Sequence, residues 1–331
     1  MIYTSERGAH LKLPTIQFGH IKSRVPVIQG GMGVGISLSG LAAAVANAGG
    51  IGTISGTGIT TEELRMHIRR TRELSKGIGY IGVNVLFAVK DFADKMKVAL
   101  EEKVDFVISG AGISRDIYAW GKEYDTPVVS IVSSAKLARI SERLGASAVV
   151  VEGFEAGGHL GTERPMFDIL PEVLEAVSIP VIAAGGILTG DDIAKALRIG
   201  ASGVQMGTRF VASHECDAPL SFKQKYVDAQ QGDTVLIKST VGLDGRAIRN
   251  EFTDRISDDA KLKISKCYDC LKVCSHRFCT MESLLTSLRG DVKNGLVFAG
   301  SRVHEIKEIL SVQQIIDHLM NEYQGALNPT T

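Results

Sequence analysis

The alternation of short apolar runs with longer amphipathic segments limits the folds open to this chain more than any other feature. Between residues 25 and 210, a segment of helical periodicity follows almost every apolar run. Apolar runs without alternation are typical of strands covered on both faces, as in parallel sheets. We therefore expect strands at 25–29, 52–55, 80–85, 104–109, 127–132, 148–152, 180–184 and 203–206.

Helical segments fill the intervals between these strands. The expected helices cover 38–48, 61–75, 90–102, 114–123, 134–144, 166–177 and 190–199. At the last of them, Thr189 and Asp192 can cap the first turn and Gly200 can end the helix. This βα alternation predicts an α/β chain closed into a (β/α)8 TIM barrel. An open, doubly wound sheet is the alternative.

After residue 210 the repeat stops. Residues 215–290 carry more charge and all five cysteines, and we expect an inserted helical cap there, near the C-terminus. The apolar segment 295–300 indicates a return to the barrel mouth. The stretch 312–323 predicts an amphipathic helix packed on the barrel, although its apolar face could also serve a homodimer. The expected organisation is a barrel core at 1–214, the cap at 215–290, and a return segment with a final helix at 291–331.

Composition excludes several classes of partner. Lys+Arg and Asp+Glu both number 37, and no basic run is interleaved with aromatic residues, so we expect no nucleic-acid partner. The longest apolar stretches are far shorter than the ~20 residues that a bilayer requires, so we expect no membrane span. The N-terminus lacks the pattern of a signal peptide, and we expect a cytoplasmic protein. Glycine stands out at 36 of 331 residues.

Two glycine motifs follow the last two expected strands. Gly185 and Gly186 come after the seventh strand, and Gly207 and Thr208 come after the eighth. In such a barrel these two loops often bind a phosphate through main-chain N–H groups. A lone Gly-Gly pair could equally be a tight turn. Because both motifs fall at the expected strand ends, the sequence favours a phosphate site.

A phosphate held there would leave the rest of the ligand over the barrel centre. Two further glycine-lined segments meet at that place, and bare backbone of this kind can lie against a planar ring. Flavin mononucleotide (FMN) is therefore the expected cofactor. The two segments contain Gln29, Gly30, Gly31 and Met32 after the first strand, and Gly157 and Gly158 after the sixth.

Two polar residues join this predicted site. His159 follows the two glycines of the sixth loop, and imidazole has an unperturbed pKa suited to proton transfer near neutrality. A surface histidine at a strand-end turn is the alternative. Asn84 ends the third strand, where its amide could bind the ring or the ribityl chain, or could cap the strand end.

These motifs together resemble the nitronate monooxygenase (2-nitropropane dioxygenase) family. The resemblance rests on 26–32, 82–84, 152–161 and 179–209, and it extends over residues 20–252 and more weakly over 289–320. The flavin-dependent enoyl-acyl-carrier-protein reductases share the same motifs, which are specific for the superfamily but do not separate its two activities.

The resemblance implies a TIM barrel that binds FMN without a covalent bond. It implies that the backbone from Gln29 to Met32 faces the ring and that His159 is the catalytic histidine. It further implies flavin contacts at Asn84, Glu152, Ala156 and Gly157, and a phosphate cradle at Gly185, Gly186, Gly207 and Thr208.

Two activities follow from the resemblance. The first is oxidation of an alkyl nitronate with dioxygen to a carbonyl compound and nitrite. There His159 would take a proton from a nitroalkane or, as imidazolium, hold the nitro group. The second is NAD(P)H-dependent reduction of an enoyl thioester. A third class, outside catalysis of this kind, is a flavin- or phosphate-binding barrel that senses redox state through its cysteines.

Those cysteines depart from the family pattern. Cys267, Cys270, Cys274 and Cys279 have the spacing C-x2-C-x3-C-x4-C, and thiolates this dense can bind zinc or an iron–sulfur cluster. The alternative is a reduced helix face, because the first three fall at i, i+3 and i+7. A disulfide is less expected in a reducing compartment. Cys216, which is remote from them, is expected to be structural.

Overall fold

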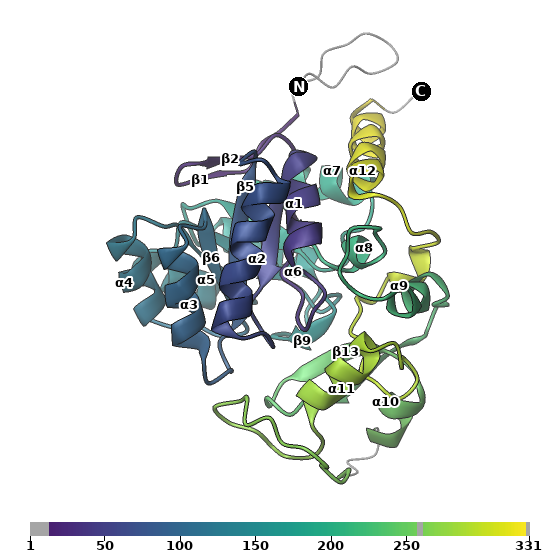
Figure 1. Cartoon of the computed structure of the whole chain (residues 1–331). Coiled ribbons are helices and arrows are strands. Elements are labelled where there is room, and N and C mark those ends of the chain that lie inside the picture. The colour runs from purple at the N-terminus through teal and green to yellow at the C-terminus, as the bar shows by residue number, and fades with distance from the viewer. Residues whose placement is uncertain (1–12, 257–260, 329–331) are drawn as a thin grey trace.

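The computed structural model describes residues 13–256 and 261–328. Residues 1–12, on which the expected absence of a signal peptide depends, lie outside the described part. Within it, eight parallel strands form a closed barrel in the order β10-β11-β3-β4-β5-β6-β7-β8. Figure 1 shows the whole chain, with helices around the barrel. Val204 on β11 pairs with Val27 on β3 and closes the ring. The barrel prediction is confirmed, and the open sheet is wrong.

The strands and the helices between them lie where the sequence predicts them. The capping pair of Thr189 and Asp192 is present, and α7 ends before Gly200. The strands are β3 (Val27–Gln29), β4 (Ile51–Ser55), β5 (Tyr80–Leu86), β6 (Phe106–Gly110), β7 (Val128–Val132), β8 (Ala148–Glu152), β10 (Val181–Ala184) and β11 (Gly203–Met206). The helices are α1 (Ser39–Asn47), α2 (Thr61–Leu74), α3 (Phe92–Glu101), α4 (Asp116–Glu123), α5 (Ala135–Leu144), α6 (Met166–Leu174), α7 (Gly190–Ile199) and the short α8 (Thr208–Val211).

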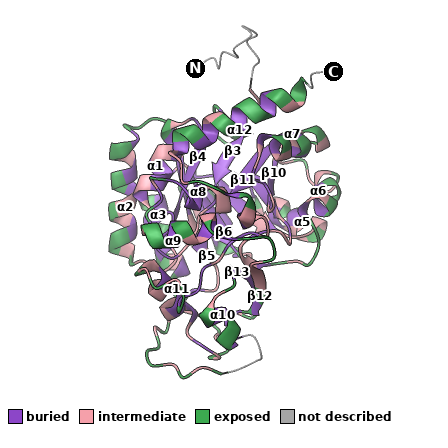
Figure 2. Ribbon diagram, turned by 90° about the vertical axis from the view of Figure 1, so that its right-hand side faces the viewer, coloured by how far each residue is buried: buried purple, intermediate pink, exposed green. Residues whose placement is uncertain are grey.

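A hairpin plugs the end of the barrel at which the strands begin. It consists of β1 (Gln17–Phe18) and β2 (Ile21–Lys22), and Phe18 packs edge-on against Phe106 with ring centroids 5.7 Å apart. The same apolar cluster includes Ile28, Ile51, Ile108, Val150 and Ile182 from the strands. Figure 2 shows the strands almost entirely buried. The interior is therefore solid, and a ligand has room only at the opposite, C-terminal end of the strands.

The cap lies at that opposite end and is only partly helical. Its helices are α9 (Leu220–Val227), α10 (Glu251–Ile256) and α11 (Thr280–Leu288). Between the first two of them, β12 (Thr234–Lys238) and β13 (Asp244–Ile248) form a hairpin that pairs with β9 (Gly158–Leu160) in an antiparallel sheet. The insertion therefore contains the expected helices and, in addition, a strand hairpin that the sequence did not predict.

The Cys267–Cys279 region has no helix or strand of its own before α11. It forms an isolated bridge between Val89 and Leu271, and Cys279 is the N-cap of α11. The alternative of a helix face carrying Cys267, Cys270 and Cys274 is therefore wrong.

The chain then returns to the barrel as predicted. Val297 accepts a hydrogen bond from the Ile248 N–H at 2.8 Å, and a 3-10 turn, η1 (Val303–Glu305), leads to α12 (Val312–Leu327). The apolar stripe of α12 is buried within this chain, where the helix packs on α7. The stripe therefore no longer argues for the homodimer.

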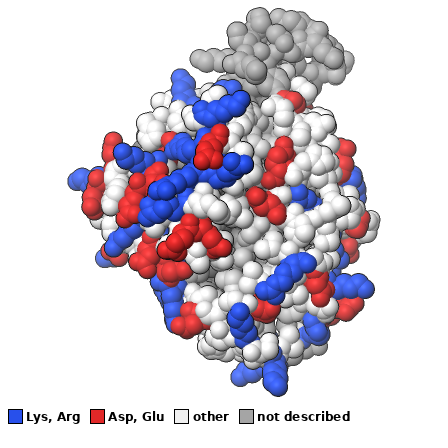
Figure 3. Space-filling model, in the orientation of Figure 1, with Lys and Arg blue, Asp and Glu red and all other residues white. Residues whose placement is uncertain are grey.

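The surface agrees with a balanced composition. On the face drawn in Figure 3, positive and negative side chains are interspersed. In the described part of the chain, no helix has both the length and the apolar character to cross a membrane.

Candidate active site

A cavity of about 270 Å³ lies at the C-terminal end of the barrel strands. Loops that follow the strands form its floor, and residues of the cap and of the return segment complete its walls. Every site residue predicted from the sequence except Gln29 lines it. These residues are Gly30, Gly31, Met32, Asn84, Glu152, Ala156, Gly157, His159, Gly185, Gly186, Gly207 and Thr208.

Gln29 lies behind the cavity wall rather than on it. Its side chain is fully buried, donates to the Ser37 hydroxyl at 2.9 Å and accepts the Thr53 N–H at 3.1 Å. The expectation that Gln29 itself contacts a cofactor is therefore corrected. Its role is to fix the loop that starts at Gly30.

Two amide side chains in the cavity have buried oxygens without a hydrogen-bond partner. Asn84 donates through Nδ2 to the Gly31 carbonyl at 3.2 Å, which leaves its Oδ1 unpaired. The Oε1 of Gln205, at the end of β11, is also unpaired. Buried acceptors in native proteins nearly always have a donor. These two fit a ligand that presents N–H or O–H groups, such as the imide or the ribityl hydroxyls of a flavin.

The glycine loops after β10 and β11 follow adjacent strands and line the cavity, where the sequence predicts a phosphate cradle. Gly185 and Gly186 adopt φ of +98° and +71°, conformations that side chains disfavour. Thr208 begins α8, and its hydroxyl accepts the Gly300 N–H at 3.0 Å, so its own proton can point to a ligand. The two loops thus offer donors on one rim of the cavity.

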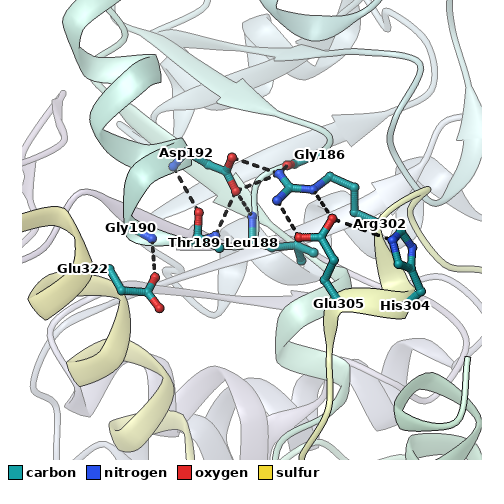
Figure 4. A network of polar contacts seen from close by, with 9 residues as sticks. All are labelled: Gly186, Leu188, Thr189, Gly190, Asp192, Arg302, His304, Glu305 and Glu322. Carbon is teal, nitrogen blue, oxygen red and sulfur yellow. Dashed lines mark hydrogen bonds and ion pairs between the residues drawn. The ribbon is translucent and has the colours of Figure 1, made fainter. Parts of the chain in front are cut away.

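Arg302 from the return segment holds the first of these loops in place (Figure 4). Its guanidinium donates to the Gly186 carbonyl at 2.6 Å and to Asp192 at 2.9 Å, and it also pairs with Glu305. Asp192 in turn accepts the Leu188 N–H at 2.9 Å. Arg302 lines the cavity, so it brings a fixed positive charge beside the glycine loop.

His159 lies on β9, where pairing with Gly245 of the cap hairpin fixes its backbone. Its Nε2 is 2.7 Å from the Ser239 hydroxyl, and its ring packs on Phe298 with centroids 5.3 Å apart. Burial lowers the pKa of His159 to about 4. The imidazole is therefore neutral near pH 7, which argues against the expected alternative in which it acts as a resident imidazolium.

The pKa of Glu152, at the end of β8, is shifted in the opposite direction. Burial raises the pKa of its carboxyl to about 7. Both side chains face the cavity, so some water reaches them, yet they lie deep inside the molecule. Two titratable groups with displaced pKa values in one cavity are typical of an active site.

Sequence reasoning missed several residues of this site. Arg302, Gly300 and Phe298 come from the return segment, and Ser239 comes from the cap hairpin. They follow no strand of the βα repeat, and no local motif marks them. Gln205 could have been predicted as a site residue, because it stands two residues before Gly207 on an expected strand.

The chain is similar to known proteins over most of its length. The family model described as nitronate monooxygenase matches residues 15–98 and 80–322. The (3aS,4S,5R,7aS)-5-hydroxy-7a-methyl-1-oxo-octahydro-1H-indene-4-carboxyl-CoA dehydrogenase of Mycobacterium tuberculosis is 33% identical over 241 residues, which are 72% of this chain and 67% of that protein.

Solved structures are also similar to this chain over most of its length. FabK from Thermotoga maritima superimposes with a TM-score of 0.80 at 35% identity, covering 94% of this chain and 95% of that one. Nitroalkane oxidase from Streptomyces ansochromogenes gives a TM-score of 0.79 at 27% identity, covering 92% and 97%. With its closed barrel and the family match along nearly all of the described residues, the chain belongs to the nitronate monooxygenase family.

Proposed function

We propose that this oxidoreductase is an FMN-dependent nitronate monooxygenase, which oxidises alkyl nitronates with dioxygen to a carbonyl compound and nitrite. The observation that carries the proposal is the buried, neutral His159 on the wall of a cavity whose rim carries the two glycine loops. Bound FMN would supply the redox chemistry, taking electrons from the substrate and passing them to dioxygen.

The residues of the chain would divide the binding between them. The loops at Gly185–Gly186 and Gly207–Thr208, supported by Arg302, would hold the phosphate. The free oxygens of Asn84 and Gln205 would accept hydrogen bonds from the ring or the ribityl chain.

Where the neutral nitroalkane rather than its nitronate enters the cavity, His159 would take its proton. A neutral imidazole can accept the proton of a nitroalkane carbon. Ser239, at 2.7 Å from Nε2, would orient the ring. An anionic nitronate in this low-dielectric cavity would raise the pKa of His159 and so favour proton uptake. Because burial keeps Glu152 largely protonated up to about pH 7, the anion would meet little negative charge there.

NAD(P)H-dependent reduction of an enoyl thioester is the second candidate. Identity to FabK, at 35%, exceeds identity to nitroalkane oxidase, at 27%. The name of the mycobacterial relative also contains a CoA thioester. Lys261, Lys263 and Lys266 could offer the cap a basic face for an acidic carrier, although they are scattered.

Anaerobic mixing separates the two candidates. The flavin absorbance is followed after addition of a nitronate and, separately, after addition of NADH. Bleaching by the nitronate alone supports the monooxygenase. Rapid bleaching by NADH, with turnover of crotonyl thioester, would replace it by the reductase.

The same assay tests His159. We expect His159→Ala to slow reduction by the neutral nitroalkane by about 10²–10⁴-fold while FMN remains bound, because that is the usual contribution of a positioned proton acceptor. His20→Ala, in which the lost side chain is half exposed, is the matched control and should reduce normally. Full activity of His159→Ala would refute the assigned role.

A further inference from the structure

Four cysteines surround a second cavity, of about 180 Å³, within the cap. Cys267, Cys270, Cys274 and Cys279 all line it. This cavity adjoins the candidate active site, because Cys270, Leu271, Thr280 and Met281 line both cavities. The four cysteines, which are spaced along the sequence, therefore lie around one cavity.

The segment that carries these cysteines is long and irregular. Apart from the bridge at Leu271, residues 261–279 contain no helix or strand. The backbone is fastened at a few points, where the N–H of Lys272 bonds to Ala88 at 2.8 Å and that of Ser275 bonds to Thr240 at 3.0 Å. Long structureless loops in compact proteins usually have a function or a cross-link.

The backbone of the segment also bends around the thiols. Asp269 lies between Cys267 and Cys270 with φ of +47°, and His276 follows Cys274 with φ of +52°. Non-glycine residues hold such conformations only where their surroundings impose them. The cysteines on either side of these bends line the same cavity.

Two of the sulfur atoms already accept backbone hydrogen bonds. The His276 N–H donates to Cys274 Sγ at 3.5 Å, and the Glu282 N–H donates to Cys279 Sγ at 3.4 Å. Cys279 is the N-cap of α11. Hydrogen bonds to the ligating sulfurs also set the properties of metal–thiolate centres.

The charges around the cavity suit an anionic thiolate centre. Lys90, Lys272 and His276 line it, and the carboxylate of Asp269 is paired with Lys90. The ammonium groups on its wall can offset the negative charge of thiolate ligands.

The room between the thiols favours a cluster over a single ion, because the cavity that they line has a volume of about 180 Å³. Four sulfurs around one tetrahedral zinc would stand only about 3.8 Å apart, given Zn–S bonds of about 2.3 Å. Among the described residues, no group of three or more His, Cys, Asp or Glu side chains is arranged to hold one metal ion. An iron–sulfur cluster distributes its four thiolates over two or four irons, so it fills a larger space between them than one ion does.

We propose that Cys267, Cys270, Cys274 and Cys279 ligate an iron–sulfur cluster in the cap, beside the active-site cavity. Four thiolates are the complete ligand set of such clusters. The proposal does not depend on which substrate the active site takes.

Metal analysis of the full-length chain purified without air tests the proposal. We expect about two or four irons per chain with matching acid-labile sulfide, and an electron paramagnetic resonance signal after dithionite reduction. One zinc per chain without sulfide would overturn the proposal. So would metal-free protein with the four cysteines as free thiols or disulfides.

Single substitutions locate the cluster. Cys274→Ser should lower iron and sulfide several-fold, whereas Cys216→Ser, a cysteine buried in the barrel core away from the cavity, should leave them unchanged. Should Cys274→Ser fail to fold, Cys267→Ser replaces an exposed side chain, and its altered resonance spectrum provides the readout. Unchanged iron and an unchanged spectrum in the cap variants would refute the ligand assignment.

Discussion

Glu152 and His159 line one cavity, and burial moves their pKa values in opposite directions. The carboxyl rises to about 7 and the imidazole falls to about 4, because in both cases a low dielectric disfavours the charged form. Between these two values both groups are uncharged. The cavity can therefore accept a planar, partly polar ligand without a fixed charge from either of them.

The buried carboxyl makes the stability of the flavin-free protein depend on pH. The unfolded chain releases the Glu152 proton near pH 4.5, whereas the folded protein keeps it until about pH 7. The folded state therefore loses stability as pH rises through this window. Because water enters the cavity, we expect the loss to be about 1–3 kcal/mol.

Glu152→Gln should remove that dependence. The variant should match the wild type below pH 4.5 and be more stable by about 1–3 kcal/mol at pH 8, as measured by urea unfolding. The contribution of His159, which has the opposite sign, is common to both proteins and cancels. Glu175→Gln, at an exposed position after α6, is the control and should show no such difference. Parallel pH curves for Glu152→Gln and the wild type would contradict the prediction.

For single residues, the sequence indicated a position at the cavity wherever the residue follows a strand of the barrel. Gly185, Gly207 and His159 could be placed because a parallel barrel gathers its strand ends at one rim. Gln29 was misplaced, because residues alternate in direction along a strand and the sequence alone does not fix which of them faces the ligand. Its buried hydrogen bonds to Ser37 and Thr53 decide the matter.

At the scale of elements, the glycine loop before α7 depends on a residue far away in the sequence. Arg302 bonds to the Gly186 carbonyl and to Asp192, and Asp192 also caps the helix. Pairing with Glu305 and with Asp192 raises the pKa of the Arg302 guanidinium, so its charge persists at every accessible pH. The return segment thus braces the expected phosphate site.

Arg302→Ala should therefore weaken the binding of FMN more than the binding of riboflavin, which lacks the phosphate. Hydrogen bonds to charged groups contribute about 1.5–3 kcal/mol, so we expect at least about a tenfold loss of FMN affinity in a fluorescence titration. Arg164→Ala, which removes an exposed pair with Glu172, is the matched control. Equal losses for FMN and riboflavin would show that Arg302 does not act through the phosphate loop.

The strands of the cap were not predicted from the sequence for one common reason. The strands β12 and β13 are short, and β12 is largely exposed or half-buried. The hairpin is stabilised because β13 pairs with β9, which lies some eighty residues earlier in the chain. Local composition carries little trace of such long-range pairing. The helices of the barrel, in contrast, have caps and an apolar face within their own sequence, as α7 shows.

At the scale of the whole molecule, the final helix is fastened to the barrel by close backbone contact. A Cβ atom on Gly190, at the start of α7, would lie 2.2 Å from the Tyr323 nitrogen and 2.4 Å from the Leu319 carbonyl oxygen of α12. The Gly190 N–H also donates to Glu322 at 2.7 Å. The two helices can meet in this way only because residue 190 has no side chain.

Gly190→Ala should accordingly lower the free energy of unfolding by about 1–3 kcal/mol through overpacking. Gly325→Ala, at a glycine of α12, is the matched control. A Cβ atom there meets nothing within 4 Å, so alanine should stabilise the helix by about 0.5–1 kcal/mol. Thermal unfolding of the two variants should therefore shift in opposite directions, and a shift in the same direction would refute the packing argument.

The sheet that joins β9 to the cap hairpin has a consequence for engineering. His159 belongs to the barrel part of the sequence, but two residues of the cap hairpin position it. The Ser239 hydroxyl lies beside its Nε2, and pairing with Gly245 fixes its backbone. Exchanging the cap between homologues to alter specificity would therefore also displace the His159 imidazole. A graft that begins after residue 248 would spare this arrangement, whereas one that begins at residue 230 would not.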